Sequence, residues 1–167
     1  MNNLNNCRSF KPSIDINSEI LILGSMPGVK SLEEQQYYAH PQNRFWKVMG
    51  CICNEPKLYE FDYENKLKTL LKNNISLWDM ISSCKREGSL DSDIQNEKPN
   101  DIRNLLKIYP NIKTICLNGN KAYSAFKKHF PDLLGKYTCY KMPSTSPANA
   151  GYNLNRLITE WSVIVPK

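Results

Sequence analysis

A short apolar run at residues 20–23, Ile-Leu-Ile-Leu, constrains the fold of this chain most strongly. It is too short for a helix, and its uninterrupted apolar character is typical of a strand that is covered on both faces of a parallel sheet. The run ends at Gly24, and the turn Ser-Met-Pro-Gly at residues 25–28 follows directly. In α/β proteins, loops at the carboxyl ends of such strands usually form the ligand site. We therefore expect the functional residues in and after this turn.

Apolar residues elsewhere in the chain recur at either strand-like or helical spacing. Short apolar runs predict further strands at residues 75–80, 112–117 and 137–142. Helical spacing predicts helices at residues 31–37, 45–52, 63–71, 102–109, 121–130 and 154–161. Strands that alternate with helices favour an α/β fold, here a three-layer α-β-α sandwich around a central four-stranded parallel sheet.

Capping residues and polar stretches mark the expected boundaries of these elements. Ser31 and Glu34 have the spacing of a capping box, and Asn43 and Asn100 are well placed to cap the helices that follow them. Residues 82–99 are polar and predict a long surface loop of a kind that is often functional. Residues 1–12 predict a loose arm, and residues 1–167 as a whole predict one domain.

Charge and cysteine content narrow the classes of partner and cofactor. The chain has 22 basic and 16 acidic residues and a net charge of +6, which favours a polyanion as partner. Its 6 cysteines lack the paired spacing of zinc or iron–sulfur sites, so we expect free thiols, no metal and no cofactor. The sequence contains neither an apolar run long enough to cross a membrane nor a secretory signal, which predicts a soluble intracellular protein.

Spacing argues against three common catalytic motifs. The turn after residues 20–23 differs from a phosphate-binding P-loop because three residues, not four, separate its glycines, and Val29 separates Gly28 from Lys30. The Gly-x-Gly-x-x-Gly pattern of dinucleotide-binding folds is absent. Only His40 and His129 are available for a nucleophilic triad, and no serine lies in a Gly-x-Ser-x-Gly setting.

Two motifs together resemble the uracil-DNA glycosylase superfamily. The first is Gly-Ser-Met-Pro-Gly at residues 24–28 with Tyr-Ala-His-Pro-Gln-Asn-Arg-Phe-Trp at residues 38–46. Mismatch-specific members of that superfamily carry Gly-Ile-Asn-Pro-Gly and then Phe-Ala-His-Pro-x-Asn-Arg-Phe-Trp. The second is Pro-Ser-Thr-Ser-Pro-Ala-Asn-Ala at residues 143–150, after the last predicted strand. With Arg-Glu-Gly-Ser-Leu-Asp at residues 86–91, the set is most similar to the hypoxanthine-DNA glycosylase branch, and the resemblance spans about residues 20–160.

One departure from the superfamily pattern bears on mechanism. Uracil-specific members have an Asp in the first turn and mismatch-specific members an Asn, whereas this chain has Met26, whose thioether cannot polarise water. The resemblance instead implies Asn43 as the catalytic residue, which would hold the attacking water. A glycosidic bond to a purine can break dissociatively, so the enzyme needs donors around the departing base more than a strong nucleophile. Capping of its helix is the simpler interpretation of Asn43, and the two roles are compatible.

The resemblance also implies a pocket for the extruded base. Gly24, Ser25 and Met26 would form its wall, and Tyr38 would stack on the base. Asp79 would read the base edge, either by accepting from N1–H of hypoxanthine or by donating if burial raises its pKa. The alternatives from the residues alone are core packing for Tyr38 and a helix cap or surface ion pair for Asp79.

The substrate base lies inside a duplex and has to be flipped out of it. Ala148 and Asn149 would lie near the gap that the base leaves, although small residues make a poor wedge. Lys85 and Arg86 are expected to attract the DNA backbone non-specifically, and ordinary solvated charges are the alternative. The residues expected to contact DNA are Pro143, Ser144, Thr145, Ser146, Lys85 and Arg86.

The function that the resemblance implies is DNA repair. The chain would hydrolyse the N-glycosidic bond of a deaminated base, above all hypoxanthine, in double-stranded DNA and leave an abasic site. No lysine is indicated as a Schiff-base nucleophile, so we expect a monofunctional enzyme without lyase activity. We expect a monomer in the cytoplasm, on the nucleoid and not on a membrane. The alternatives are a uracil or mismatch glycosylase of the same fold and a nucleic-acid-binding module without catalysis.

Overall fold

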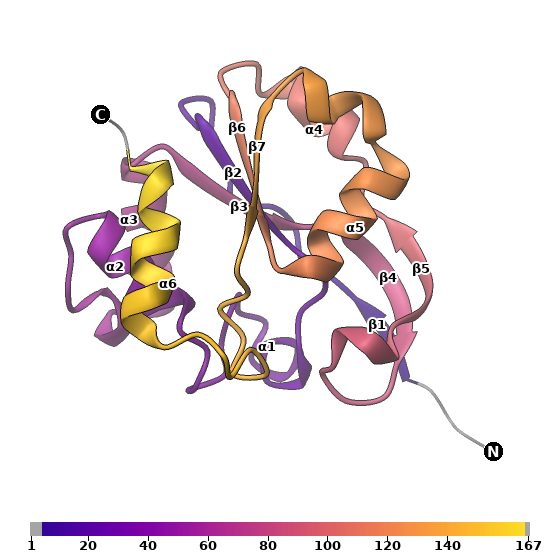
Figure 1. Ribbon diagram of the computed structural model, residues 1–167, viewed down its shortest axis with the longest axis horizontal. Coiled ribbons are helices and arrows are strands. Elements are labelled where there is room, and N and C mark those ends of the chain that lie inside the picture. Colours follow the sequence, from indigo (N-terminus) through magenta and orange to yellow (C-terminus); the bar gives the residue numbers. More distant parts are fainter. Residues whose placement is uncertain (1–4, 166–167) are drawn as a thin grey trace.

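The computed structural model describes residues 5–165, and its centre is a four-stranded parallel sheet (Figure 1). The strands are β2 (Ile20–Gly24), β3 (Ile75–Asp79), β6 (Thr114–Asn118) and β7 (Thr138–Met142). Their order is β3-β2-β6-β7, and each neighbouring pair is parallel. β2 is an inner strand, which explains why all of its residues are apolar and buried. The predicted sheet is confirmed, with boundaries that differ by one or two residues.

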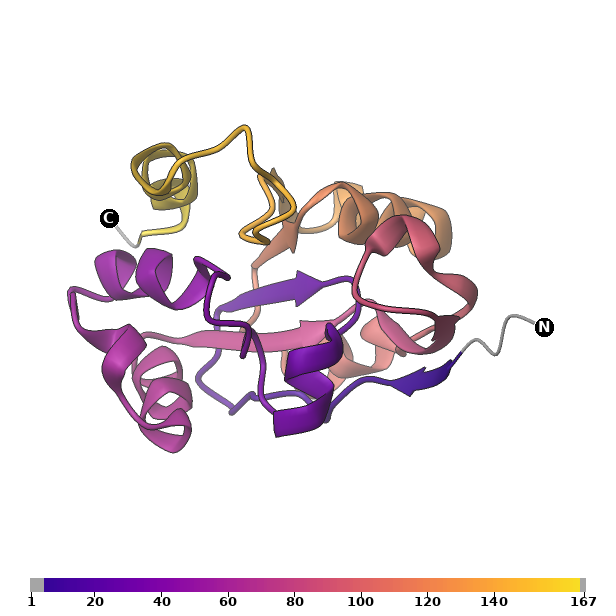
Figure 2. The same ribbon diagram turned by 90° about the horizontal axis from the view of Figure 1, so that it is seen from below.

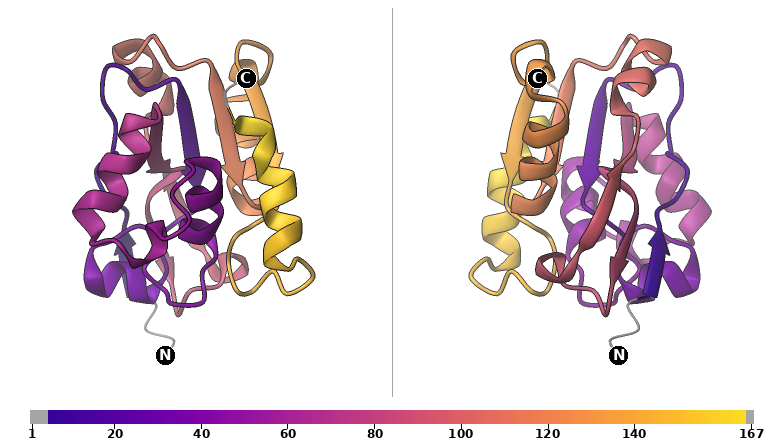
Figure 3. Two further views of the ribbon diagram at one scale, coloured as in Figure 1. Left: turned by 90° about the vertical axis from the view of Figure 1, so that its left-hand side faces the viewer. Right: turned by 90° about the vertical axis from the view of Figure 1, so that its right-hand side faces the viewer.

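Helices cover both faces of this sheet. One face carries α2 (Phe45–Ile52), α3 (Tyr63–Lys72) with η1 (Leu58–Glu60) before it, and α6 (Leu154–Trp161) with η4 (Ser162–Ile164) after it. The other face carries α4 (Ile102–Ile108), α5 (Asn120–His129) and η3 (Pro131–Gly135) (Figure 3). Side chains of β2 alternate between the two cores: Ile22 packs with the first group and Leu23 with the second. The predicted three-layer sandwich is confirmed. Within residues 5–165, no helix is long and apolar enough to cross a membrane.

A second, antiparallel sheet lies beside the first, and the sequence did not predict it. It consists of β1 (Asn5–Arg8), β4 (Ile81–Arg86) and β5 (Gln95–Pro99), in the order β1-β4-β5. The predicted loop over residues 82–99 is therefore wrong, because two strands occupy most of it. Register shifts between β4 and β5 interrupt the alternation of buried and exposed residues, which hides the strand pattern in a polar sequence.

The loose arm predicted for residues 1–12 is wrong from Asn5 onward; residues 1–4 lie outside the described part. Cys7 lies opposite Cys84 in the antiparallel sheet and is buried. The ring of Phe10 packs edge-on against Tyr37 at 5.2 Å between ring centroids. A bridge between Ser13 and Leu77 then continues the chain along β3. These contacts are non-local, so the short polar segment gave no sign of them.

None of the three predicted residues is the N-cap of its helix. The first helix, α1 (Val29–Glu34), begins after Gly28, so Ser31 lies inside it and accepts a hydrogen bond from the Ala39 backbone N–H instead. α1 also ends at Glu34, before the left-handed Gln35, and not at residue 37. Asp101, not Asn100, caps α4. Arg44, not Asn43, is the N-cap of α2, although Asn43 Oδ1 accepts from the backbone N–H of Phe45, the first residue of this helix, at 2.9 Å.

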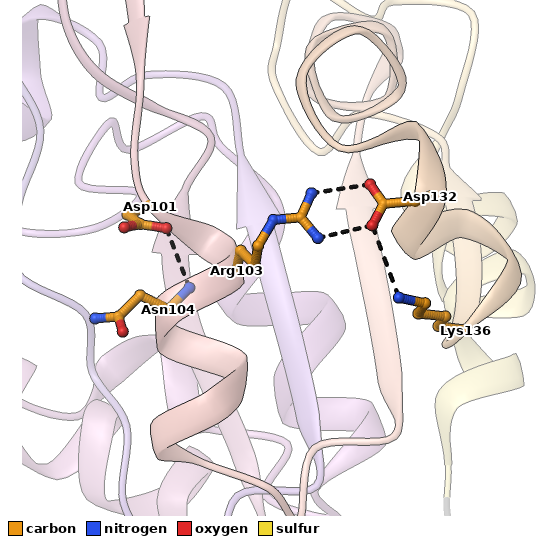
Figure 4. Close-up of polar contacts among 5 residues, drawn as sticks. All are labelled: Asp101, Arg103, Asn104, Asp132 and Lys136. Carbon is orange, nitrogen blue, oxygen red and sulfur yellow. Dashed lines mark hydrogen bonds and ion pairs between the residues drawn. The ribbon is translucent and has the colours of Figure 1, made fainter.

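A bidentate ion pair ties α4 to the segment that leads into β7 (Figure 4). Arg103 donates from both terminal nitrogens to the two carboxylate oxygens of Asp132, at 2.7 and 2.8 Å. This hydrogen bonding lowers the pKa of Asp132 to about 2, and Lys136 adds a longer contact at 3.9 Å. The same figure shows Asp101 accepting from the Asn104 N–H as the cap of α4. These contacts lie on the surface, where ion pairs contribute little to the free energy of folding. They link neighbouring elements.

Candidate active site

A cleft of about 1000 Å³ opens at the carboxyl ends of the parallel strands. Figure 1 places α1, the segment after β7 and the turn between β4 and β5 together at this end of the molecule, and Figure 2 views the same end from below. This is the place where α/β sheets usually bind ligands. The lining includes residues from each of the two motifs and from the turn between β4 and β5: Gly24, Ser25, Met26, Tyr38, Asn43, Asp79, Leu90, Asp91, Asn118, Ser144 and Ser146.

Gly24 and Asp79 form the floor of this cleft. They are the last residues of β2 and β3 and lie directly opposite each other in the sheet. A β-carbon added to Gly24 would be 2.6 Å from Asp79 Oδ1 and 3.1 Å from the hydroxyl of Tyr38. The glycine thus lets the carboxyl group and the phenol approach one another over the end of the strand. Asn100, the predicted cap, donates instead to the backbone carbonyl of Asp79 at 2.8 Å and holds it in place.

The carboxyl group of Asp79 is buried and has an uncommitted oxygen. Its side chain is only 4% exposed, and Oδ2 has no hydrogen-bond partner among the described residues. Burial and, to a smaller extent, the nearby Asp91 carboxylate raise the pKa of Asp79, and Arg86 opposes them, with a net pKa of about 7. A carboxyl group of this pKa exchanges its proton near neutral pH and can donate or accept a hydrogen bond.

Tyr38 lies in the cleft with one face of its ring covered. It stacks on Phe45, with 3.8 Å between ring centroids and 21° between ring planes. Its backbone φ is +55°, a left-handed conformation that a tyrosine rarely adopts. Its hydroxyl accepts a hydrogen bond from the side chain of Asn118 at 3.3 Å. Burial raises the pKa of Tyr38, so the phenol stays neutral.

Asn43 lies at the cleft wall and is half-buried. Its Oδ1 accepts a hydrogen bond from the Phe45 backbone N–H, while Nδ2 makes no hydrogen bond to any of residues 5–165. A carbonyl oxygen has a second lone pair, so this bond leaves capacity for one more donor such as water. The start of α2 therefore holds the Asn43 amide at the cleft and leaves it able to make further hydrogen bonds.

Arg44, next to Asn43, fastens the second motif to the first. Its backbone N–H and its Nε both donate to the carbonyl of Thr145, at 3.1 and 3.4 Å. Nη2 donates to the carbonyls of Ser146 and Asn149 at 2.8 and 3.0 Å, and Nη1 donates to that of Tyr152. One guanidinium thus holds four carbonyl groups of the segment after β7. The sequence gave no specific sign of this role.

Asn118 is a second site residue that sequence reasoning missed. It ends β6 and is buried. Its Nδ2 donates to Tyr38 and to the hydroxyl of Thr145, and its Oδ1 accepts from the Thr145 N–H at 3.1 Å. Its position after a buried strand at the carboxyl edge was the available signal.

The predicted DNA-contact residues divide into accessible and buried ones. Thr145 is fully buried and its hydroxyl accepts from Asn118, so its predicted contact with phosphate is wrong. Arg86 is 1% exposed and donates to the carbonyl of Pro27, so its predicted surface role is wrong as well; it supports the first turn from inside. The accessible or partly accessible members are Pro143, Ser144, Ser146 and Lys85.

The turn between β4 and β5 closes the remaining side of the cleft. Ser25 donates from Oγ to Asp91 Oδ1 at 2.6 Å, and the Val29 N–H donates to Ser89 Oγ at 2.8 Å. The short helix η2 (Asp91–Asp93) follows. Residues 25–29 are therefore hydrogen-bonded to the segment at residues 86–91. The two segments belong to one site.

Comparison with known proteins identifies the family to which this architecture belongs. The model of the Uracil DNA glycosylase superfamily matches residues 12–162. The chain belongs to the uracil DNA glycosylase superfamily. This membership confirms the resemblance, and the superfamily match covers both motifs and every residue of the cleft named above.

Similar proteins come from two Methanosarcina species. A Methanosarcina acetivorans protein named hypoxanthine DNA glycosylase is 42% identical over 158 residues, which are 94% of this chain and 96% of the relative. A Methanosarcina barkeri protein of the same name is 44% identical over 115 residues, 69% of this chain and 72% of the relative. The solution NMR structure of a candidate uracil DNA glycosylase from M. acetivorans superposes with a TM-score of 0.83 at 41% identity, covering 96% of this chain and 97% of that one. The superfamily fold is thereby confirmed.

Proposed function

We propose that this chain is a monofunctional hypoxanthine-DNA glycosylase that acts on double-stranded DNA as a single-domain monomer. The observation that carries the proposal is the convergence of Tyr38 and Asn43, from the segment at residues 38–46, with Asp79, at the end of β3, on one cleft. Relatives named hypoxanthine DNA glycosylase support the choice of base. The cleft of about 1000 Å³ is at the upper end of ligand sites and has room for a purine nucleoside.

Asn43 serves as the catalytic residue in this proposal. Its Oδ1 accepts from Phe45 with one lone pair and from the attacking water with the other. Bond cleavage is dissociative, so the water adds to a sugar that already carries positive charge and needs orientation more than activation. Met26 is buried at 7% exposure and offers only a thioether, so it shapes the wall of the pocket.

Asp79 and Tyr38 recognise the departing base. The base lies with one face against the Tyr38 ring, whose other face Phe45 covers. In its neutral form the Asp79 carboxyl group, which lines the cleft, donates to O6 of hypoxanthine, where negative charge grows as the bond breaks. A neutral carboxyl group suits this role better than a carboxylate, which would repel the same charge.

DNA contacts lie around the mouth of the cleft. The hydroxyl oxygens of Ser144 and Ser146 accept from the Ser146 and Ala148 N–H groups, so their protons are free to donate to phosphate. Lys85 is exposed and adds attraction that falls with salt. The substrate places the protein inside the cell, on the nucleoid.

The lysines at the cleft favour hydrolysis without strand cleavage. A Schiff-base lysine has to lose its proton, and burial away from carboxylates promotes that loss. Lys121 instead pairs with Glu97 at 2.6 Å, and Lys30 pairs with Glu34 at 3.1 Å. Both of these amines are engaged in ion pairs with carboxylates, which supports a monofunctional enzyme.

An oligonucleotide assay tests the proposal. Duplexes with hypoxanthine, uracil, xanthine or no lesion are incubated with the protein and then treated with alkali, which cleaves at abasic sites. We expect cleavage at hypoxanthine, and strand breaks without alkali would contradict the monofunctional assignment. Cleavage at uracil alone would favour a uracil glycosylase of this fold. No cleavage at any lesion would leave a nucleic-acid-binding module.

A further inference from the structure

The turn at residues 25–28 is held by two oppositely charged side chains. Arg86, the last residue of β4, donates from Nη2 to the carbonyl of Pro27. Asp91, the first residue of η2, accepts from Ser25 Oγ at 2.6 Å. The short segment between β4 and η2 thus places a guanidinium and a carboxylate against one turn. This turn follows directly on β2, whose end forms part of the floor of the cleft.

Within residues 5–165, Arg86 is a buried cation to which no carboxylate is hydrogen-bonded. The residue is 1% exposed, and neither Nε nor Nη1 has a hydrogen-bond partner in that part of the chain. An arginine side chain keeps its charge in proteins. A buried charge is unfavourable unless an opposite charge lies nearby. The surroundings of Arg86 therefore have to supply a negative charge.

Two carboxyl groups near Arg86 differ in their fitness for this role. Asp79 is 4% exposed and lies on the floor of the cleft, whereas Asp91 is an exposed residue of the cleft rim and accepts from Ser25. Water and a hydroxyl donor stabilise a carboxylate, whereas burial disfavours one. Two neighbouring carboxyl groups also oppose each other's ionisation. The three side chains together are electrically neutral when Asp91 is ionised and Asp79 holds a proton.

Within the described part of the chain, the other titratable side chains that interact with Asp79 are phenols. They come from the segment after α1 and from the start of α3: Tyr37, Tyr38 and Tyr63. Burial raises the pKa of all three phenols, so they stay neutral. The charges that act on Asp79 therefore belong to Asp91 and Arg86.

We propose that Asp91 is a positioning residue of the glycosylase reaction, whose carboxylate balances the charge of Arg86 so that Asp79 keeps its proton for the departing base. The inference rests on the proposed function for the role of Asp79. Without the Asp91 charge, Asp79 itself becomes the counter-ion of Arg86 and loses its proton at lower pH. The ionised form repels the negative charge that grows on the base, so excision slows. Asp91 acts through Asp79 and needs no contact with the base.

The pH dependence of single-turnover excision tests this role. Asp91→Asn removes the charge and keeps an oxygen that can accept from Ser25. We expect its rate to match wild type within about twofold at pH 5 and to be about tenfold lower at pH 8, as for a decrease of about one unit in the pKa of Asp79. Asp93→Asn is the matched control, since Asp93 is an exposed carboxylate of η2 that does not line the cleft.

The proton of Asp79 can also be followed without catalysis. Carbon-13 labelling of aspartate makes its side-chain carboxyl carbon visible to NMR, and Asp79→Asn identifies the signal. We expect the titration midpoint of Asp79 near the pKa of about 7 in wild type. The midpoint should lie about one pH unit lower, or more, in Asp91→Asn and should not move in Asp93→Asn.

An unchanged midpoint in Asp91→Asn, or an equal decrease in Asp93→Asn, would overturn the proposal. A ratio of Asp91→Asn to wild-type rates that is the same at pH 5 and pH 8 would also overturn it, because a purely structural bond to Ser25 has no such pH dependence. If wild type excises no hypoxanthine at any pH, the proposed function fails. The NMR titration then still decides whether Asp91 controls the proton of Asp79.

Discussion

The carboxyl group of Asp79 lies so close to Gly24 that a β-carbon at position 24 would be 2.6 Å from Asp79 Oδ1. Contacts this short essentially never occur for a real β-carbon, so a side chain at position 24 has to displace the carboxyl group. The backbone of Gly24 has ordinary strand geometry, and Gly24 lies opposite Asp79 in the parallel sheet. Glycine is therefore required at position 24 because the Asp79 carboxyl group lies so close to it. The requirement comes from the geometry of the site and not from the backbone conformation of Gly24.

Gly24→Ala should impair catalysis more than folding. The added methyl group moves Asp79, and a displacement of about 1 Å in a catalytic group costs on the order of 100-fold in rate. The measurement is single-turnover excision of hypoxanthine alongside thermal unfolding. Gly135→Ala is the control, because a β-carbon there meets nothing within 4 Å. Equal rates for the two variants would show that Asp79 needs no fixed position.

The excision rate should fall as pH rises through about 7. Burial raises the pKa of Asp79 to about 7, and the neutral form is the proposed donor to the departing base. Asp79→Asn keeps a donor at all pH values, so its profile should lose this limb while its rate stays within about tenfold of wild type. Asp79→Ala should lose about 100-fold, as for other donors to a developing anion. A rate that rises through pH 7 in wild type would identify the carboxylate as the active form.

The same carboxyl group should make stability depend on pH in the opposite sense to a typical surface aspartate. The folded pKa of about 7 lies above the ordinary 3.8, so the native state holds the proton more tightly and loses stability as pH rises between these values. The free energy of unfolding of Asp79→Asn should therefore increase relative to that of wild type from pH 4 to 7, by ~1–4 kcal/mol. This difference should level off above pH 7. Urea unfolding at several pH values measures the difference, and a constant difference would contradict the raised pKa.

Asn43 has a structural role and a proposed catalytic role that substitution can separate. Asn43→Ala should cost about 1 kcal/mol of stability through the lost hydrogen bond from the Phe45 N–H and should abolish most turnover while DNA binding persists. Asn43→Ser retains an oxygen that can accept from Phe45 but has a shorter side chain that is unable to reach the water. We expect Asn43→Ser to recover the stability and not the turnover, measured by unfolding and single-turnover assays. Recovery of both would reduce Asn43 to a structural role.

Arg44→Gln should release the segment after β7. The carbonyls of Ser146, Asn149 and Tyr152 lose a guanidinium donor and that of Thr145 keeps only the Arg44 backbone N–H, which we expect to cost about 2–4 kcal/mol. Arg44→Lys should fail to rescue, since one ammonium cannot reach all four. Limited proteolysis within residues 143–152 and kcat/KM on a duplex measure the effect. Arg156→Gln is the control, because Arg156 contacts the same segment only by stacking on the Tyr152 ring at 4.0 Å.

The parallel sheet and its helices were predictable because their signals are local. Residues 20–23 are apolar without interruption since β2 is covered on both faces, and the helices carry one apolar face each. The antiparallel sheet was not predictable in the same way. β4 and β5 are polar, and their register shifts break the period of two that identifies a half-buried strand.

The residues of the site also divide into those with a local sequence signal and those without one. Tyr38 and Asn43 could be predicted at the site because they lie in one contiguous, recognisable motif, and Asp79 because it lies near the end of a predicted strand. Arg86 was assigned to the surface by its charge, whereas the structure buries it against the carbonyl of Pro27. Asn118 escaped notice because its partners lie 80 and 27 residues away along the chain. Contacts of this kind depend on tertiary packing, which no local pattern encodes.

The Arg44 attachment has a consequence for how this enzyme can change over time. Arg44 binds the segment after β7 only through backbone carbonyl groups, which every amino acid possesses. Substitutions in that segment therefore leave its anchoring intact, and its side chains are free to diverge toward new lesions or new flanking sequences. The arginine itself has no such freedom, so inherited variation should concentrate in the segment and avoid the residue that holds it.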